Sequence, residues 1–118
     1  TKADVRRGLK ELKIDIWDKP AFACLASRIP YGEKITVDKL SAVYQSEDVM
    51  HRLGFRQVRV RHHGFLARIE VDPTERHRLF DEALMDRIQR ELQHLGFIYV
   101  TMDLGGYKMG SLNYEIQR

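Results

Sequence analysis

Apolar residues recur at helical spacing in three stretches of the chain. Residues 2–13 and 36–53 each place one apolar face among charged residues, and residues 73–95 carry a longer apolar stripe. Thr36 is of the type that caps the start of a helix, and Gly54 is placed where a glycine commonly ends one. The third stretch is long for one helix, so we expect two short helices there.

A shorter period follows the second of these stretches. Residues 55–71 alternate between apolar and polar positions, as in a β-hairpin with its turn at residues 63–64. Arg59 and Arg61 fall on the polar face of this hairpin, opposite its valines. Residues 97–104 form the pattern of a third strand. We therefore expect an α+β fold in which a small antiparallel sheet, the hairpin plus a third strand, packs against helices.

Residues 14–34 follow neither period. Pro20, Pro30 and Gly32 punctuate them, so we expect a structured loop with room for one helical turn. Loops of this length without regular structure usually carry function. This stretch is therefore the first place to look for chemistry.

Length and composition limit the class of protein. The chain has 118 residues, 43% of them hydrophobic and 31% charged, which is typical of one folded domain and argues against intrinsic disorder. No apolar run approaches the roughly 18 residues of a transmembrane helix, and no secretion signal is evident, so we expect no membrane partner and a cytoplasmic location. One cysteine excludes an internal disulfide. The chain begins with Thr1 rather than Met, so we expect a piece of a longer protein.

The positive charge is concentrated in one stretch. Residues 49–69 contain no acidic residue. The basic residues of this stretch are Arg52, Arg56, Arg59, Arg61, Arg68, His51, His62 and His63. Subtracting the five arginines from the net charge of +3 leaves −2 for the rest of the chain. Such local basicity indicates a site for an anion rather than a protein that seeks nucleic acid.

Cys24 allows two interpretations. A lone cysteine is commonly a small buried hydrophobic residue. Cys24, however, lies in the proline-bounded stretch rather than on a periodic apolar face, and Lys19 and Arg28 are near it in sequence. Nearby cations favour the thiolate, which can act as a nucleophile, a metal ligand or a source of sulfur.

Arg59 and Arg61 also allow two interpretations. A run of charge is often a solvated face of a hairpin. Two arginines at positions i and i+2 of a strand, however, lie parallel and about 7 Å apart, which suits a phosphate or carboxylate because guanidinium binds oxyanions bidentately. Arg68 and Glu70 could lie across the hairpin on the same face, with Glu70 neutralising part of it.

The remaining candidates are weaker. Ser27 beside Arg28 could hydrogen-bond a phosphate. Adjacent histidines on a strand point to opposite faces and cannot chelate one metal, so we place His62 and His63 in a turn and expect no metal site. The glycine-rich residues 104–111 lack the contiguous Gly-Lys-Ser/Thr of a P-loop and no helical pattern follows them, so we expect no ATP site in this chain.

Three segments carry more specific motifs. They are Trp17-Asp18-Lys19-Pro20-Ala21 with Ala23-Cys24-Leu25-Ala26-Ser27-Arg28-Ile29-Pro30-Tyr31-Gly32, then Val58-Arg59-Val60-Arg61-His62-His63-Gly64 with Ala67-Arg68-Ile69-Glu70-Val71, and finally Tyr99-Val100-Thr101-Met102-Asp103-Leu104 with Gly106-Tyr107-Lys108 and Gly110-Ser111. In this order they resemble the LarE-type ATP-dependent sacrificial sulfur transferases (sulfur insertases) of the PP-loop superfamily. The resemblance covers essentially the whole chain.

The resemblance implies a function in making the nickel-pincer nucleotide cofactor used by lactate racemase. In that family an N-terminal PP-loop domain uses ATP and Mg²⁺ to adenylate a carboxylate of a pyridinium mononucleotide. A cysteine of the C-terminal half attacks it, releases AMP, leaves its sulfur on the substrate and becomes dehydroalanine. Residues 1–118 would be this C-terminal domain, with the PP-loop domain outside the chain as its partner, and alone they would be inactive.

The resemblance also assigns residues. Cys24 matches the sacrificial cysteine. Ser27, Arg28, Arg59 and Arg61 match positions that bind the substrate phosphate, and Glu47 matches one that shapes the site. A family variant holds an iron–sulfur cluster on three cysteines; this chain has one, so we expect no cluster.

Two alternatives remain open. The basic hairpin with Phe55 and Phe65 could belong to an RNA-binding domain of another PP-loop enzyme, although these aromatics flank the basic run rather than interleave with it. The chain could instead be an oligomerisation domain. We also expect a homo-oligomer if the chain is part of a sulfur transferase.

Overall fold

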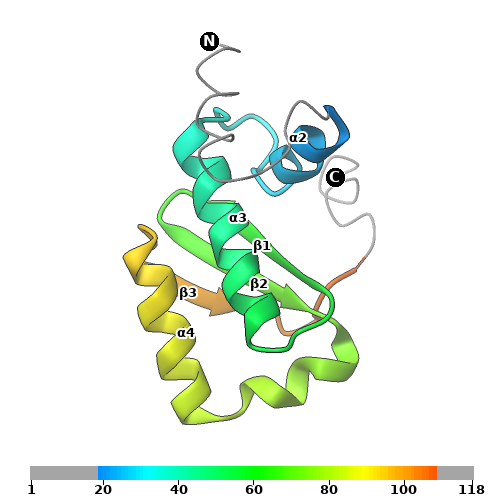
Figure 1. Ribbon diagram of the computed structural model, residues 1–118, viewed down its shortest axis with the longest axis vertical. Helices are drawn as coiled ribbons and strands as arrows, with labels where there is room; N and C mark the ends of the chain where they lie inside the picture. The colour runs from blue at the N-terminus through cyan, green and yellow to red at the C-terminus, as the bar shows by residue number, and fades with distance from the viewer. Residues whose placement is uncertain (1–18, 109–118) are drawn as a thin grey trace.

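The computed structural model describes residues 19–108, with side chains from Ala23 onward. The predicted helix at residues 2–13 lies outside the described residues. The elements in chain order are α2 (Lys19–Ala26), α3 (Val37–Arg52), β1 (Val58–His63), β2 (Leu66–Val71), the 3₁₀ helix η1 (Pro73–Leu79), α4 (Glu82–His94) and β3 (Tyr99–Met102) (Figure 1). None of the helices within this range is long and apolar enough to span a bilayer.

The three strands form one mixed sheet in the order β1-β2-β3. β1 and β2 are the predicted hairpin, with Val60 opposite Ile69 and Arg61 opposite Arg68. β3 pairs with β2 in parallel, with Ala67 opposite Val100. The α+β class is confirmed, but the expected all-antiparallel sheet is wrong in its third strand. η1 and α4 form a crossover that carries the chain back to the start of β2, and a crossover joins parallel neighbours.

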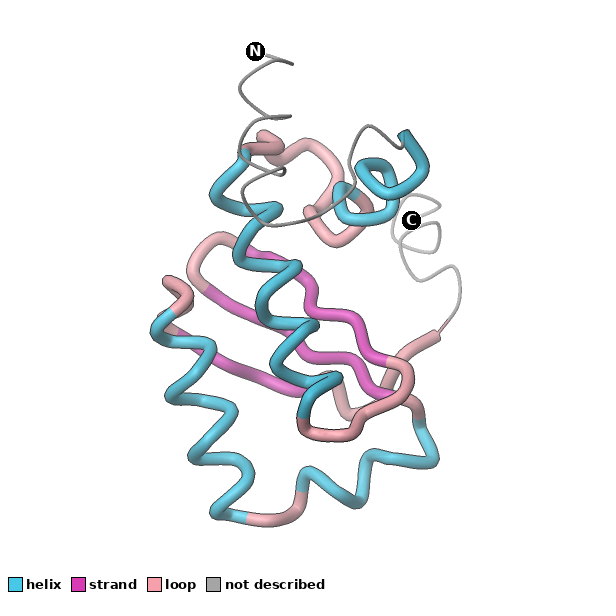
Figure 2. The backbone as a smooth tube through the Cα atoms, in the orientation of Figure 1, coloured by secondary structure: helices cyan, strands magenta, loops and turns pink. Residues whose placement is uncertain are grey.

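Helices α3 and α4 lie side by side on the same face of the sheet (Figure 2). The buried side chains between these two layers include Val49, Met50, Phe55, Val58, Val60, Ile69, Val71, Ile88 and Leu92. A second, smaller cluster joins α2 to α3 through Leu25, Ile29, Leu40 and Val43. Burying one such aliphatic side chain contributes about 1.5–3 kcal/mol, so α2 and the turn after it are anchored mainly by two side chains, Leu25 and Ile29.

The predicted boundaries of α3 and of the region after it are confirmed. The Thr36 side chain accepts a hydrogen bond from the Lys39 backbone N–H, as an N-cap does. Gly54 follows the helix with φ of 97°, which favours glycine. The long apolar stripe divides into η1 and α4, and Asp81 caps α4 by accepting from the Leu84 N–H.

The structured loop expected at residues 14–34 is wrong in one part. Lys19–Ala26 form an eight-residue helix, α2, and Cys24 lies in its last turn. Pro20 stands in the first turn of this helix, where a missing backbone N–H removes no hydrogen bond. Pro20 therefore marks the start of a helix, whereas the sequence pattern indicated a loop.

The segment after β3 makes a tight turn at residues 103–106 and then continues along β2. The Tyr107 N–H donates to the Val71 carbonyl at 2.6 Å, and the Gly106 N–H donates to the Asp103 carbonyl. Gly106 has φ of +80°, and a Cβ built there would lie 2.6 Å from the Val71 carbonyl oxygen. Only glycine allows the backbone to approach the Val71 carbonyl this closely. This close approach fixes the position of Tyr107.

Gly106→Ala should therefore cost about 2–4 kcal/mol of unfolding free energy, because it adds the left-handed strain of a non-glycine residue to an overlap with backbone. Gly32→Ala is the matched control: its φ is +89°, but no atom lies within 4 Å of the added Cβ. It should lose only about 1 kcal/mol. Urea unfolding of both variants measures the difference, and equal losses would contradict a close approach at Gly106.

Candidate functional site

The outer edge of β1 is covered by side chain and loop rather than by another strand. The Val60 N–H donates to Glu47 Oε2 at 3.0 Å, and the His62 N–H donates to the Arg28 carbonyl at 2.9 Å. An uncovered edge strand would leave these donors to water or to another chain. Glu47 of α3 and the turn after α2 thus meet on β1.

A buried ion pair holds this junction together. Arg28 Nε lies 2.9 Å from Glu47 Oε2 and Arg28 Nη2 lies 3.3 Å from Glu47 Oε1, a two-pronged contact. Arg28 is 5% exposed and Glu47 is 8% exposed. Burial by itself disfavours the guanidinium charge, but the hydrogen bonds and charges of Glu47 and Cys24 outweigh it, so the pKa of Arg28 is raised above its ordinary value.

The same guanidinium reaches Cys24. Arg28 Nη1 lies 3.1 Å from Cys24 Sγ and 3.1 Å from Ser27 Oγ, and it also donates to the Cys24 carbonyl. Cys24 is exposed, so the interpretation as a buried hydrophobic residue is wrong. The Ser27 hydroxyl donates to the Cys24 carbonyl at 2.6 Å. The thiol is therefore exposed to solvent beside the Arg28 guanidinium, and the buried Glu47 carboxylate fixes the position of that guanidinium.

A second cluster of ion pairs lies on the face of the sheet opposite α3 and α4. Glu70 is 1% exposed, and its two oxygens accept from Arg61 Nε at 3.1 Å and from Arg68 Nη2 at 3.0 Å. Arg61 Nη1 also donates to the Ser27 carbonyl at 3.2 Å. Arg61 thus joins the sheet to the turn that follows Cys24, and the neutralising position expected for Glu70 is confirmed.

Arg59 stands apart from this group. Its Nη1 donates to the Val58 carbonyl at 2.9 Å, and its guanidinium carbon lies 4.9 Å from the centre of the Tyr107 ring. The structure thus connects Cys24, Ser27, Arg28, Glu47 and Arg61 by hydrogen bonds and places Arg59 two positions along the same face. Tyr107 was not among the sequence candidates, since it lies far along the chain and no local pattern pairs it with Arg59.

The two histidines lie in β1, so the expectation of a turn is wrong; the turn falls at residues 64–65. His62 is buried on the helix side, its ring 5.1 Å from that of Phe97. Burial, and then the nearby charge of Lys39, lower the pKa of His62. Over residues 19–108 no three His, Cys, Asp or Glu side chains are grouped closely enough to hold a metal ion.

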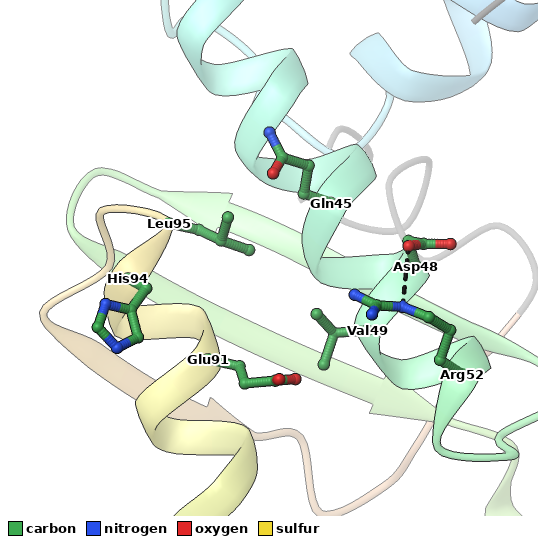
Figure 3. Close-up of a pocket in the computed structure, with 7 residues that line it drawn as sticks. All are labelled: Gln45, Asp48, Val49, Arg52, Glu91, His94 and Leu95. Atoms are coloured by element: carbon green, nitrogen blue, oxygen red, sulfur yellow. Dashed lines mark ion pairs between the residues drawn. The ribbon is translucent and has the colours of Figure 1, made fainter. Parts of the chain in front are cut away.

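A hollow of about 240 Å³ lies elsewhere, between α3 and α4 (Figure 3). It is lined by Gln45, Asp48, Val49, Arg52, Glu91, His94 and Leu95. Asp48 and Arg52 form an exposed ion pair at 3.1 Å on its wall. It shares no residue with the group around Cys24, and we assign it no part in that chemistry.

Glu47→Gln should destabilise the fold by about 3 kcal/mol, because it leaves the buried Arg28 charge without its counter-ion. Asp48→Asn is the matched control one residue away: it breaks the exposed pair with Arg52 and should cost less than about 0.5 kcal/mol. Denaturant unfolding at neutral pH compares them. Similar small losses in both variants would show that the Arg28–Glu47 pair is dispensable.

Stability should fall as the pH drops through the histidine range because of His62. Its folded-state pKa is lower than the ordinary value of 6.5, so the unfolded chain binds the extra proton first. The contribution is complete above about pH 6.5 and is lost as the pH falls toward the folded-state pKa. Thermal unfolding between about pH 7.5 and 5.5 should show a shallower slope for His62→Phe than for the parent. A parental slope in His62→Phe would refute the assignment.

Comparison with known proteins gives two relatives and no matching family model. The chain is 45% identical over 113 residues to an uncharacterised protein of Synechocystis, covering 96% of this chain and 42% of the relative. It is 43% identical over 113 residues to a pyridinium-3,5-bisthiocarboxylic acid mononucleotide synthase of Lactiplantibacillus plantarum, covering 95% of this chain and 40% of that protein. The chain thus spans about two fifths of the length of the curated relatives it matches, and over that span it is similar to a bisthiocarboxylate-forming synthase.

Proposed function

We propose that this chain is the sulfur-donating part of a pyridinium bisthiocarboxylic acid mononucleotide synthase of the LarE type, acting in nickel-pincer cofactor biosynthesis. The observation that carries the proposal is the placement of Cys24. Its thiol is exposed, and its sulfur lies 3.1 Å from an arginine nitrogen that a buried carboxylate holds in place. The similarity to the Lactiplantibacillus plantarum synthase over nearly the whole chain supports the same substrate class.

The first step uses the Cys24 thiolate. Arg28 Nη1 lies 3.1 Å from the sulfur, so its N–H can hydrogen-bond and orient the thiolate during the attack. The thiolate attacks the adenylated carboxylate, a C–S bond forms, and AMP leaves. Because the donors of Arg28 are directed at Glu47, Ser27 and Cys24, we assign Arg28 to the thiolate rather than to the substrate phosphate.

The second step consumes the residue. Cys24 loses its α-proton to a base, its Cβ–S bond breaks, and the electron pair of that bond leaves with the sulfur on the substrate as a thiocarboxylate. What remains in the protein is dehydroalanine. Cys24 lies in the last turn of a short helix that Leu25 and Ile29 pack onto α3, and Cys24 itself is exposed.

The basic face of the sheet holds the anionic end of the substrate in this proposal. Arg59 supplies the phosphate contact, and Arg61, fixed between Glu70 and the Ser27 carbonyl, keeps the face aligned with the thiol. The chain spans 40% of the length of the Lactiplantibacillus plantarum synthase, and we place adenylation, with its ATP and Mg²⁺, in a PP-loop domain outside this chain.

The RNA-binding alternative has less support. Of its two candidate stacking residues, Phe55 is 1% exposed and packs in the core, beneath the guanidinium of Arg78. Phe65 is exposed but stands at the hairpin turn. One exposed aromatic residue at a turn does not make a stacking platform along the basic face.

One turnover of the full-length protein should make Cys24 lighter by the mass of one H₂S. Peptide mass analysis before and after reaction with substrate, ATP and Mg²⁺ measures this change. Cys24→Ala should yield no thiocarboxylate while keeping the parental unfolding temperature, because the side chain is exposed. Product formation with an unchanged Cys24 would overturn the sacrificial mechanism.

A further inference from the structure

Arg59 differs from Arg61 and Arg68, the other two arginines of the sheet, because it has no carboxylate counter-ion among the described residues. Glu70 stands directly opposite Arg59 in the strand register. Both oxygens of Glu70 are nevertheless taken by Arg61 and Arg68. Within the described part of the chain, no carboxylate pairs with Arg59, and its one hydrogen bond goes to the Val58 carbonyl. Arg59 is therefore the cation of this face that has charge to offer an incoming anion.

Tyr107 determines how that charge is presented. Its ring centre lies 4.9 Å from the Arg59 guanidinium carbon, a cation–π contact. A guanidinium that contacts a ring and is bound through one Nη keeps the N–H groups of its remaining edge for a bidentate oxyanion. Without the ring, this long side chain would sample other rotamers and bind an anion at greater entropic cost.

The position of Tyr107 is itself imposed by the sheet. The segment after β3 follows β2, since Asp103 N–H donates to the Ile69 carbonyl and Tyr107 N–H donates to the Val71 carbonyl. Between them Gly106 makes the close passage that no side chain would allow. The backbone of β2 thus fixes the position of Tyr107, whose ring contacts the Arg59 guanidinium on the neighbouring strand β1.

We propose that Tyr107 is a positioning residue that holds Arg59 for the phosphate of the mononucleotide, so that the segment Asp103–Lys108 forms one wall of the substrate site. The proposal rests on the proposed function for the identity of the substrate. It adds a residue that neither neighbours Cys24 nor belongs to the hairpin. It also gives the close turn at Gly106 a role in binding.

The test measures what the phosphate contributes to binding. Nicotinate mononucleotide and its riboside differ by the phosphate alone and carry the same pyridinium carboxylate. Calorimetric titration of the full-length protein with each gives a ratio of affinities. Tyr107→Leu should lower this ratio about three- to tenfold, Tyr107→Phe should retain the parental ratio, and both should bind the riboside as the parent does.

Two controls separate positioning from a loss of fold. Tyr99→Leu removes a tyrosine that is 63% exposed on β3 and should leave the ratio unchanged. In an Arg59→Gln background, Tyr107→Leu should have no further effect, because its action passes through Arg59. An unchanged ratio in Tyr107→Leu, or a further fall in the Arg59→Gln background, would overturn the proposal. The conversion of Cys24 to dehydroalanine is measured in a separate experiment. If the parent protein forms dehydroalanine but Tyr107→Leu leaves the ratio unchanged, the role of Tyr107 is refuted and the proposed function is not.

Discussion

The Arg28–Glu47 ion pair is the interaction on which the rest of the site depends. Its two prongs are buried, and each partner has a second task. Glu47 also accepts the Val60 N–H, which closes the edge of β1, and Arg28 also reaches the sulfur and carbonyl of Cys24. A buried pair of this kind adds little net stability over an apolar one. Its value here is geometric, because it fixes three elements, α2, α3 and β1, relative to one thiol.

On the face of the sheet opposite α3 and α4, the three arginines are not held by one common carboxylate. One carboxylate, Glu70, holds two arginines, and the third arginine is held by a ring instead. A carboxylate within reach of all three would neutralise the face and compete with an anionic substrate. An aromatic ring orients a guanidinium without cancelling its charge. This division explains how a stretch rich in arginine can be both folded and receptive to an anion.

Much of the fold follows from local signals in the sequence. Thr36 and Gly54 bound α3, alternation around Arg59 and Arg61 gives the hairpin, and the long apolar stripe divides as its length suggests. The parallel direction of β3 was missed, although the helical stretch between the hairpin and residues 97–104 is the kind of crossover that joins parallel strands. Cys24 and Ser27 were proposed from their motif, and Glu70 was expected beside the arginines of the hairpin, but the Arg28–Glu47 pair and the Arg59–Tyr107 contact were not expected. Tyr107 reaches Arg59 only through the packing of a distant segment on β2.

A residue that is consumed in a reaction cannot contribute much to the stability of the fold that presents it. Cys24 meets this condition: it is exposed, while Leu25 and Ile29 carry the packing of its segment onto α3. The polar contacts of its neighbours run through its backbone carbonyl as well as its sulfur, so they persist when the side chain changes. Conversion of Cys24 to dehydroalanine would remove one hydrogen bond to Arg28 and leave the Glu47 contacts intact. The arrangement therefore separates the atom that is given up from the atoms that hold the site together.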